Sequence, residues 1–173
     1  MTTYFERLPD GSIGRTTSFR SIAKDNGILE NETQEPIIYF CGKKYIESEI
    51  PSLPDYLETS KREAFSKLNV LFNEKTQKAR LMSSLGFEID ANNIANANVD
   101  SLVMVMEEDD IQSDHFCDAN NQLHLVTLED VKTMRKEIKK NAKSLYLKKW
   151  ALRNAINQAS TKEELDNVHL SLD

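Results

Sequence analysis

The sequence predicts an α+β protein with three parts. Short runs of alternating apolar and polar residues before residue 50 are typical of strands. Two prolines, Pro51 and Pro54, then interrupt the pattern, and apolar residues recur at helical spacing on either side of a second strand-rich stretch. We therefore divide the 173 residues into a β-rich N-terminal module (1–50), a connecting helix (51–78) and an α+β C-terminal domain with a β-hairpin and a long helix (79–173).

Composition narrows the classes of function. A hydrophobic content of 39% supports one or two small domains, not a large core around a deep cleft. The net charge of -6 argues against nucleic acid and against anionic membrane surfaces as partners. No apolar run is long enough to span a bilayer, and Met1–Glu6 lacks the pattern of a secretory signal. We expect synthesis in a cytoplasm.

The N-terminal module contains two hairpin signals. Tyr4–Leu8 and Ile13–Thr17 flank a Pro-Asp-Gly turn, and Ile37–Phe40 returns through Cys41-Gly42-Lys43 into Lys44–Ile46. Between them, residues 18–26 suit two helical turns that end at Gly27.

A helix is predicted over residues 53–78, with Ser52 as a candidate N-cap. Its apolar residues fall on one stripe at three- and four-residue spacing: Leu57, Ala64, Leu68, Leu71 and Phe72. Charged residues surround that stripe, so we expect an exposed connecting helix.

The C-terminal domain begins with a predicted strand at Leu85–Ile89. Asp90 or Asn92 can cap a following helix that runs to about Met106. The expected buried side of this helix consists of Ile94, Leu102, Val103 and Met106. The acidic run Glu107–Asp110 opposes the helix dipole and indicates the helix end.

A further hairpin and the longest helix follow. His115–Cys117 and Leu123–Val126 flank an asparagine-rich turn. Thr127 is a good N-cap for a helix to about Ala159, and Ser160 or Thr161 can begin a short final helix with a capping box.

The long helix supplies the candidate interaction residues. Its apolar residues recur every seven positions: Val131, Ile138, Leu145, Leu152 and Ala159. Such a repeat requires a partner helix, from the same chain or from a neighbour. Tyr146 and Trp150 lie one turn apart and are either interface anchors or intramolecular packing residues. We name Ile138, Leu145, Leu152, Tyr146 and Trp150 as candidates.

The sequence does not predict a metal or cofactor site. Cys41 and Cys117 form no CxxC pair, and His115, Cys117 and His124 offer three zinc-type ligands on one hairpin without a fourth. The stretch from Asp118 to Glu129 follows the spacing of a calcium loop, but Leu123 replaces the essential glycine. We expect a hairpin turn instead.

No catalytic motif is present either. The acidic run near Asp110 is typical of a solvated loop, whereas catalytic carboxylates need environments that separate their pKa values. Neither a Gly-rich phosphate loop nor a Gly-x-Ser-x-Gly turn occurs. We expect a protein that is not an enzyme.

The order of motifs resembles an uncharacterised domain family of tail and tail-fibre-region proteins from tailed bacteriophages. The motifs that carry this resemblance are Gly86–Asn92, His115–Glu129, Trp150–Ile156 and Thr161–Leu165. The N-terminal segments Pro9–Ile13, Ile22–Gly27 and Gly42–Ile46 look like the opening module of short phage tail proteins.

The resemblance implies a non-enzymatic structural component of a phage tail, in the baseplate or tail-fibre attachment region. Its implied partners are other tail or fibre proteins and further copies of itself, and its implied location is the virion after synthesis in the host bacterial cytoplasm. A tail-fibre assembly chaperone that is absent from the mature virion is the alternative. A glycan hydrolase would need two carboxylates across a groove, which the sequence does not place.

Overall fold

The computed structural model describes residues 4–18, 29–30, 35–53 and 55–173. These form two compact units, Met1–Ser60 and Lys61–Asp173, which are described separately. Both sheets and helices are present, and they confirm the predicted α+β class.

The first unit is a five-stranded antiparallel sheet in the order β3-β1-β2-β5-β4. Its strands are β1 (Tyr4–Arg7), β2 (Ile13–Thr17), β3 (Leu29–Glu30), β4 (Ile37–Phe40) and β5 (Lys43–Ile46). The pairs β1–β2 and β4–β5 confirm both predicted hairpins. The helical turns predicted at 18–26 lie almost wholly outside the described residues.

Each hairpin turns where the sequence supplies the required backbone. Gly11 adopts a φ of 81°, and the Asp10 carboxylate accepts hydrogen bonds from the backbone N–H and the hydroxyl of Ser12. In the second hairpin, Cys41 and Gly42 both have positive φ, as a two-residue turn between twisted strands requires. The hairpins enclose a small core of Phe5, Ile13 and Ile46, with Ile37 packed against it.

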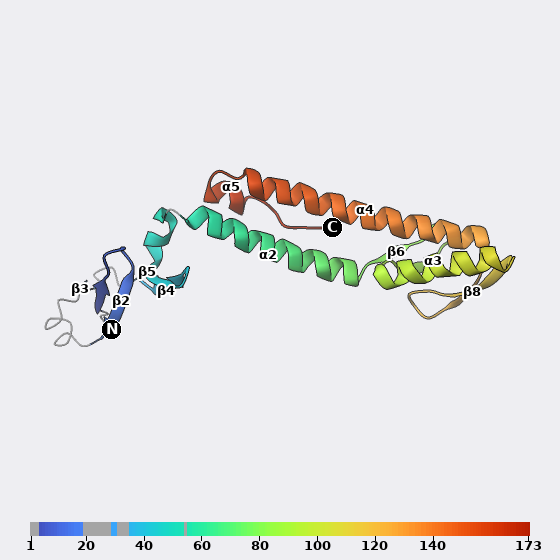
Figure 1. Cartoon of the computed structure of the whole chain (residues 1–173), viewed down its shortest axis with the longest axis horizontal. Helices are drawn as coiled ribbons and strands as arrows, with labels where there is room; N and C mark the ends of the chain where they lie inside the picture. Colours follow the sequence, from blue (N-terminus) through green and yellow to red (C-terminus); the bar gives the residue numbers. More distant parts are fainter. Residues whose placement is uncertain (1–3, 19–28, 31–34, 54) are drawn as a thin grey trace. The chain divides into compact units, whose positions relative to one another are not determined.

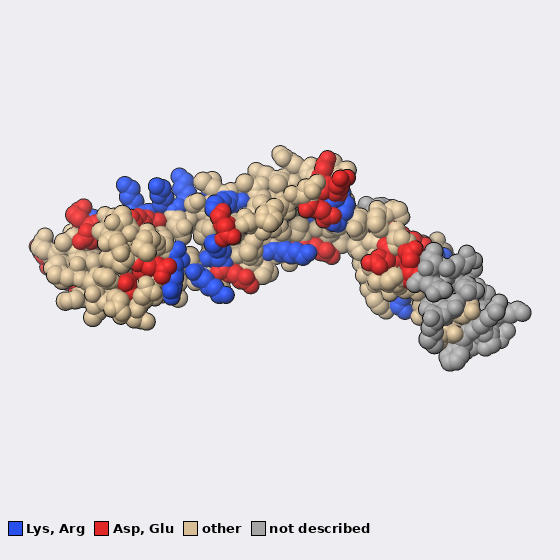
Figure 2. All heavy atoms as spheres, turned by 180° about the vertical axis from the view of Figure 1, so that it is seen from behind, with Lys and Arg blue, Asp and Glu red and all other residues tan. Residues whose placement is uncertain are grey.

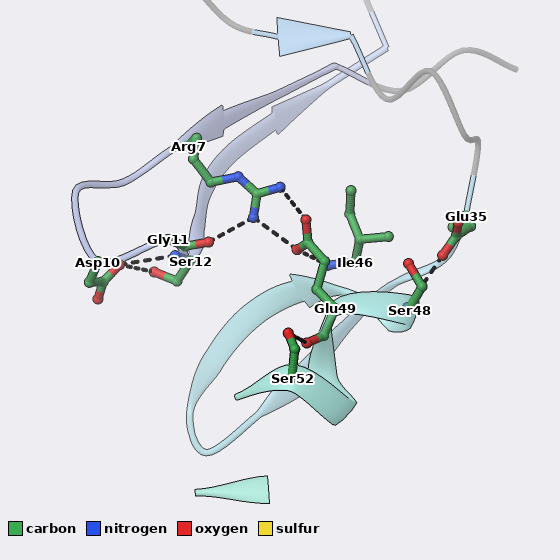
Figure 3. A network of polar contacts seen from close by, with 9 residues as sticks. All are labelled: Arg7, Asp10, Gly11, Ser12, Glu35, Ile46, Ser48, Glu49 and Ser52. Atoms are coloured by element: carbon green, nitrogen blue, oxygen red, sulfur yellow. Dashed lines mark hydrogen bonds and ion pairs between the residues drawn. The ribbon is translucent and has the colours of Figure 1, made fainter. Parts of the chain in front are cut away.

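A 3-10 helix, η1 (Glu47–Ser52), joins this sheet through an ion pair (Figure 3). The Arg7 guanidinium donates to both carboxylate oxygens of Glu49, at 2.7 and 2.9 Å, and thereby lowers the pKa of Glu49. The Ser52 hydroxyl donates to the Glu49 carbonyl within η1. The predicted helix-capping role of Ser52 is therefore wrong, and the next helix begins only at Tyr56.

The second unit is built along the long helix α4 (Leu128–Gln158). Residues 61–77 of helix α2 (Tyr56–Gln77) lie beside its C-terminal half in the antiparallel sense (Figure 1). Lys61 donates to the Asn157 carbonyl at 3.3 Å, and Leu68 is fully buried. This part of α2 is thus a packing partner of α4.

The N-terminal half of α4 carries the larger core. It packs with helix α3 (Asn93–Glu108) and with two hairpins, β6 (Arg80–Met82) with β7 (Glu88–Asp90), and β8 (Ser113–Cys117) with β9 (Leu123–Thr127). The core side chains come from every one of these regions: Ala79, Ile89, Ala91, Val99, Val103, Met106, Val126, Val131, Met134 and Ile138.

Two expectations for this region need correction. The strand predicted at Leu85–Ile89 is β7, displaced toward Asp90 and paired with β6, which the sequence did not predict. Residues 83–86 form its turn instead, with Gly86 at a φ of 92°. Ile94, expected on the buried side of α3, is 72% exposed, because the buried face centres on Val99, Val103 and Met106.

Helices α3, α4 and α5 start at predicted caps. Asn92 accepts from the Ala95 N–H, Thr127 forms a capping box with Asp130, and Thr161 begins helix α5 (Lys162–Asp166). Beyond α5 the chain places Leu172 in a buried position, and Asp173 accepts hydrogen bonds from Lys75 and Lys148. In the described part of the chain, no helix is long and apolar enough to cross a membrane.

Candidate interaction surfaces

The predicted interaction residues divide between two faces of α4. Ile138 and Leu145 are 1% and 6% exposed, and Leu152 is half-buried. Together with Val131 and Ala159 they form the inner face, which packs on the hairpins and α3 at one end and beside α2 at the other. The partner helices that the seven-residue repeat requires are therefore supplied by the same chain.

Tyr146 and Trp150 lie at the edge of this packing and remain about half exposed. The rings of Tyr146 and Phe72 on α2 form a T-shaped pair, with centroids 5.9 Å apart. The Arg153 guanidinium lies 5.6 Å from the centroid of Trp150. Both aromatic residues thus combine intramolecular contacts with an exposed surface.

The opposite side of α4, which we call the outer face, consists of Lys136, Lys140, Lys143, Leu147 and Trp150. Spacings of three and four residues place them on one side of a helix. Leu147 is 61% exposed and Trp150 is 50% exposed. The outer face is therefore basic toward its N-terminal end and apolar toward its C-terminal end.

The bulk composition hides the basic part of this face. Residues 135–149 contain seven basic residues and one acidic residue, whereas the whole chain has a net charge of -6. Figure 2 shows lysine and arginine side chains gathered over the middle of the second unit. A charge count in windows along the sequence would have found this segment.

Helix α3 also has an exposed face, which carries acidic residues where the outer face of α4 carries lysines. Ile94, Met104 and Val105 are exposed on the side away from its buried residues. Exposed Glu108 and Asp109 follow at its C-terminal end, while the neighbouring Glu107 is paired with Lys132 at 3.0 Å. We call Ile94, Met104, Val105, Glu108 and Asp109 the α3 face.

Asp118 organises the β8–β9 hairpin. Its Oδ1 accepts from the backbone N–H groups of Asn120 and Gln122 at 2.8 and 2.9 Å, and its Oδ2 lies 2.9 Å from Nε2 of His124. The Gln122 N–H, followed by His124, lowers the pKa of the Asp118 carboxyl. His124 also stacks on Phe87, with centroids 3.9 Å apart. These contacts stabilise the turn of the β8–β9 hairpin and fix His124 against Phe87.

The register of the β8–β9 hairpin places the three possible zinc ligands on different faces. His115 pairs with Leu125 and Cys117 with Leu123 on the exposed face, whereas His124 pairs with Phe116 on the face toward the core. They cannot converge on one ion, and no metal-binding group of three occurs among the described residues. The stretch with calcium-loop spacing contains the predicted hairpin turn, in which Asp118 accepts hydrogen bonds from the backbone of its own turn.

A cleft of about 420 Å³ lies within the second unit, where α2 ends beside α4. Leu71, Ala79 and Leu145 form its apolar lining, and charged side chains, Lys75, Lys78, Arg80 and Glu74, surround them. Leu145 is therefore an inner-face residue that borders this cleft.

Comparison with known proteins gives one relationship. The model of a family described as a domain of unknown function, DUF4376, matches residues 68–169. No curated protein and no solved structure matches the chain. The matched range runs from the buried Leu68 of α2 to beyond α5, so it covers most of the second unit and more than half of the chain.

Proposed function

We propose a function for this chain, which belongs to the DUF4376 family of domains of unknown function: it is a non-enzymatic structural component of a bacteriophage tail, in the baseplate or tail-fibre attachment region. It acts through protein–protein contacts made by its second unit. Other tail or fibre proteins and further copies of this chain are its partners, and the virion is its location.

The observation that carries this proposal is the outer face of α4. Leu147 and Trp150 are large apolar side chains that stay at least half exposed although the same helix buries a complete inner face. Tryptophan is enriched among the residues that dominate binding energy at protein interfaces. Their exposure within one helical turn supports a role in binding another protein.

The phage setting is supported by the sequence resemblance rather than by the family relationship. The segments that carry it, such as Gly86–Asn92 and His115–Glu129, form the β6–β7 turn region and the β8–β9 hairpin of the second unit. The region of resemblance and the proposed binding surface therefore belong to the same unit.

Quantitative mass spectrometry of purified phage particles tests the proposal. We expect the chain at a fixed small copy number per particle relative to the major tail protein. Presence in the infected-cell lysate together with absence from the particle would contradict a structural role and would favour the assembly chaperone.

A particle-incorporation assay tests the surface itself. A phage that lacks the gene is supplied with a chain carrying Leu147→Ser and Trp150→Ala, and we expect several-fold lower incorporation than with the wild-type chain. Val70→Ser is the matched control, because Val70 is an exposed apolar residue of α2 outside the outer face. Equal incorporation of all three chains would exclude the outer face as the binding surface.

A further inference from the structure

We propose that the outer face of α4 binds the α3 face of a second copy, so that the protein self-assembles head to tail. This inference rests on the proposed function, because it names one partner of the same surface. It is carried by the complementary charge and apolar content of the two faces.

The basic half of the outer face has free charges. Lys136, Lys140 and Lys143 are exposed, and among the described residues they form no ion pair. Other lysines of α4 are engaged: Lys139 donates to Asp100 at 2.7 Å, and Lys148 donates to the Asp173 carbonyl at 2.6 Å. The three outer lysines are therefore available to an acidic partner.

The α3 face has the matching acidic end. Glu108 and Asp109 are exposed and form no ion pair within the described part of the chain, in contrast to Glu107. They also lie at the C-terminal end of α3, where the helix dipole disfavours negative charge. Contact with lysines of another copy would relieve this unfavourable placement.

The order of residues fixes the relative direction of the two helices. In an antiparallel arrangement with Glu108 opposite Lys143, Asp109 lies toward Lys140 and Met104 lies opposite Leu147, because Met104 and Leu147 are each four residues from the charged residue of that pair. The distance along α4 from Lys136 to Trp150 is roughly 21 Å, and that along α3 from Ile94 to Glu108 is also roughly 21 Å, at 1.5 Å per residue. The two faces are thus comparable in length.

A second copy fits this face better than a nucleic acid. A polyanion would contact the lysines but would leave Leu147 exposed, and the net charge of -6 would repel it. The α3 face supplies both the acidic and the apolar part that the outer face requires.

The geometry predicts repeated association. The outer face and the α3 face are different surfaces of one chain, and both point away from the inner packing of α3 on α4. A contact between unlike surfaces is heterologous, and it produces a ring if the rotation closes and a filament if it does not.

Charge-reversed variants of the full chain test the proposal by analytical ultracentrifugation over a concentration series. One variant carries Lys136→Glu, Lys140→Glu and Lys143→Glu, and a second carries Glu108→Lys and Asp109→Lys. We expect the self-association constant to fall at least tenfold in each. A chain with all five substitutions should recover association, because the charges are then complementary again.

The control for the lysine variant carries Arg62→Glu, Lys67→Glu and Lys78→Glu. These substitutions change the net charge by the same amount as in the lysine variant, at exposed positions outside both faces. It should associate like the wild-type chain. Circular dichroism of every variant checks that the fold is retained, and association should weaken at about 1 M salt, where the Debye length is roughly 3 Å.

A wild-type chain that stays monomeric, or a five-fold substituted chain that does not recover, would overturn the inference. If the wild-type chain is monomeric and binds a mixed-sequence DNA duplex, and the lysine variant does not bind it, the outer face would be assigned to nucleic acid instead. Self-association of a chain that is absent from phage particles would remove the proposed function alone. Presence in particles as a monomer would remove this inference alone.

Discussion

The inner and outer faces of α4 differ completely in environment although they share one backbone. Leu145 on the inner face is 6% exposed, and Leu147, two residues later, is 61% exposed. Two residues rotate a helix by roughly 200°, so identical side chains lie on opposite sides. The comparison shows that the buried face follows from the helical repeat of apolar residues. The role of the outer face depends instead on whether another segment or another protein packs against it.

The strongest test places a charge on each face. Ile138→Asp should lower the unfolding free energy of the second unit by at least about 4 kcal/mol, because the carboxylate has no partner in the apolar core. Leu147→Asp should change it by no more than about 0.5 kcal/mol. Urea unfolding followed by circular dichroism measures both, and similar losses in the two variants would show that the faces are not distinct.

Truncations within the inner face sharpen the comparison further. Ile138→Ala should cost about 3 to 4 kcal/mol and Leu145→Ala about 2 kcal/mol, because the cost rises with the cavity that remains. Leu145 borders the cleft beside α2, so water already reaches part of its surroundings. Leu147→Ala is the control in the same urea experiment, and a larger loss for Leu145→Ala than for Ile138→Ala would contradict this reasoning.

The stability of the β8–β9 hairpin, which packs on the inner face, should depend on pH through the Asp118 carboxyl. Because its pKa is lowered in the folded protein, the stability it contributes is present above the unfolded value of about 3.9 and is lost as pH falls through the folded pKa. The difference in unfolding free energy between the wild-type chain and Asp118→Asn should thus shrink below about pH 4. A difference that stays constant down to about pH 3 would disagree.

The smallest effect concerns the start of the helix that carries both faces. Thr127→Ala removes the cap that accepts from the Asp130 N–H and should cost about 1 kcal/mol. Thr133 is the matched control, because its hydroxyl only donates to the Glu129 carbonyl within the same helix, and Thr133→Ala should cost less than about 0.5 kcal/mol. Thermal unfolding of both variants checks this difference.

Much of the fold could be predicted because its signals are local. Positive φ at Gly11 and Gly42, the caps at Asn92 and Thr127 and the end of α3 after Glu108 each depend on a few neighbouring residues. Strand β6 was missed because Arg80–Met82 is short and largely exposed, and only its pairing with β7 makes it a strand. Ile94 was misplaced because an apolar residue in the first turn of a helix does not by itself fix which face is buried.

The candidate surface was predicted only in part. The sequence indicates Trp150 and Tyr146 as candidates because aromatic residues stand out, but a whole-chain net charge that is negative conceals Lys136, Lys140 and Lys143. The sequence also grouped Ile138, Leu145 and Leu152 with the aromatic pair, although the three belong to the inner face. Only the packing of α4 separates residues that serve the fold from residues left for a partner.

The amino-acid sequence alone is sufficient to predict the α+β class, the hairpins β1–β2, β4–β5 and β8–β9, the starts of α3, α4 and α5, and the repeat of apolar residues along α4. These follow from backbone preferences and from hydrophobic periodicity, which act over a few residues. The tertiary structure alone decided that the partners of this repeat are α2, α3 and the hairpins of the same chain, and that the outer face remains exposed. Burial depends on which distant segments meet, and that is a property of the whole folded unit.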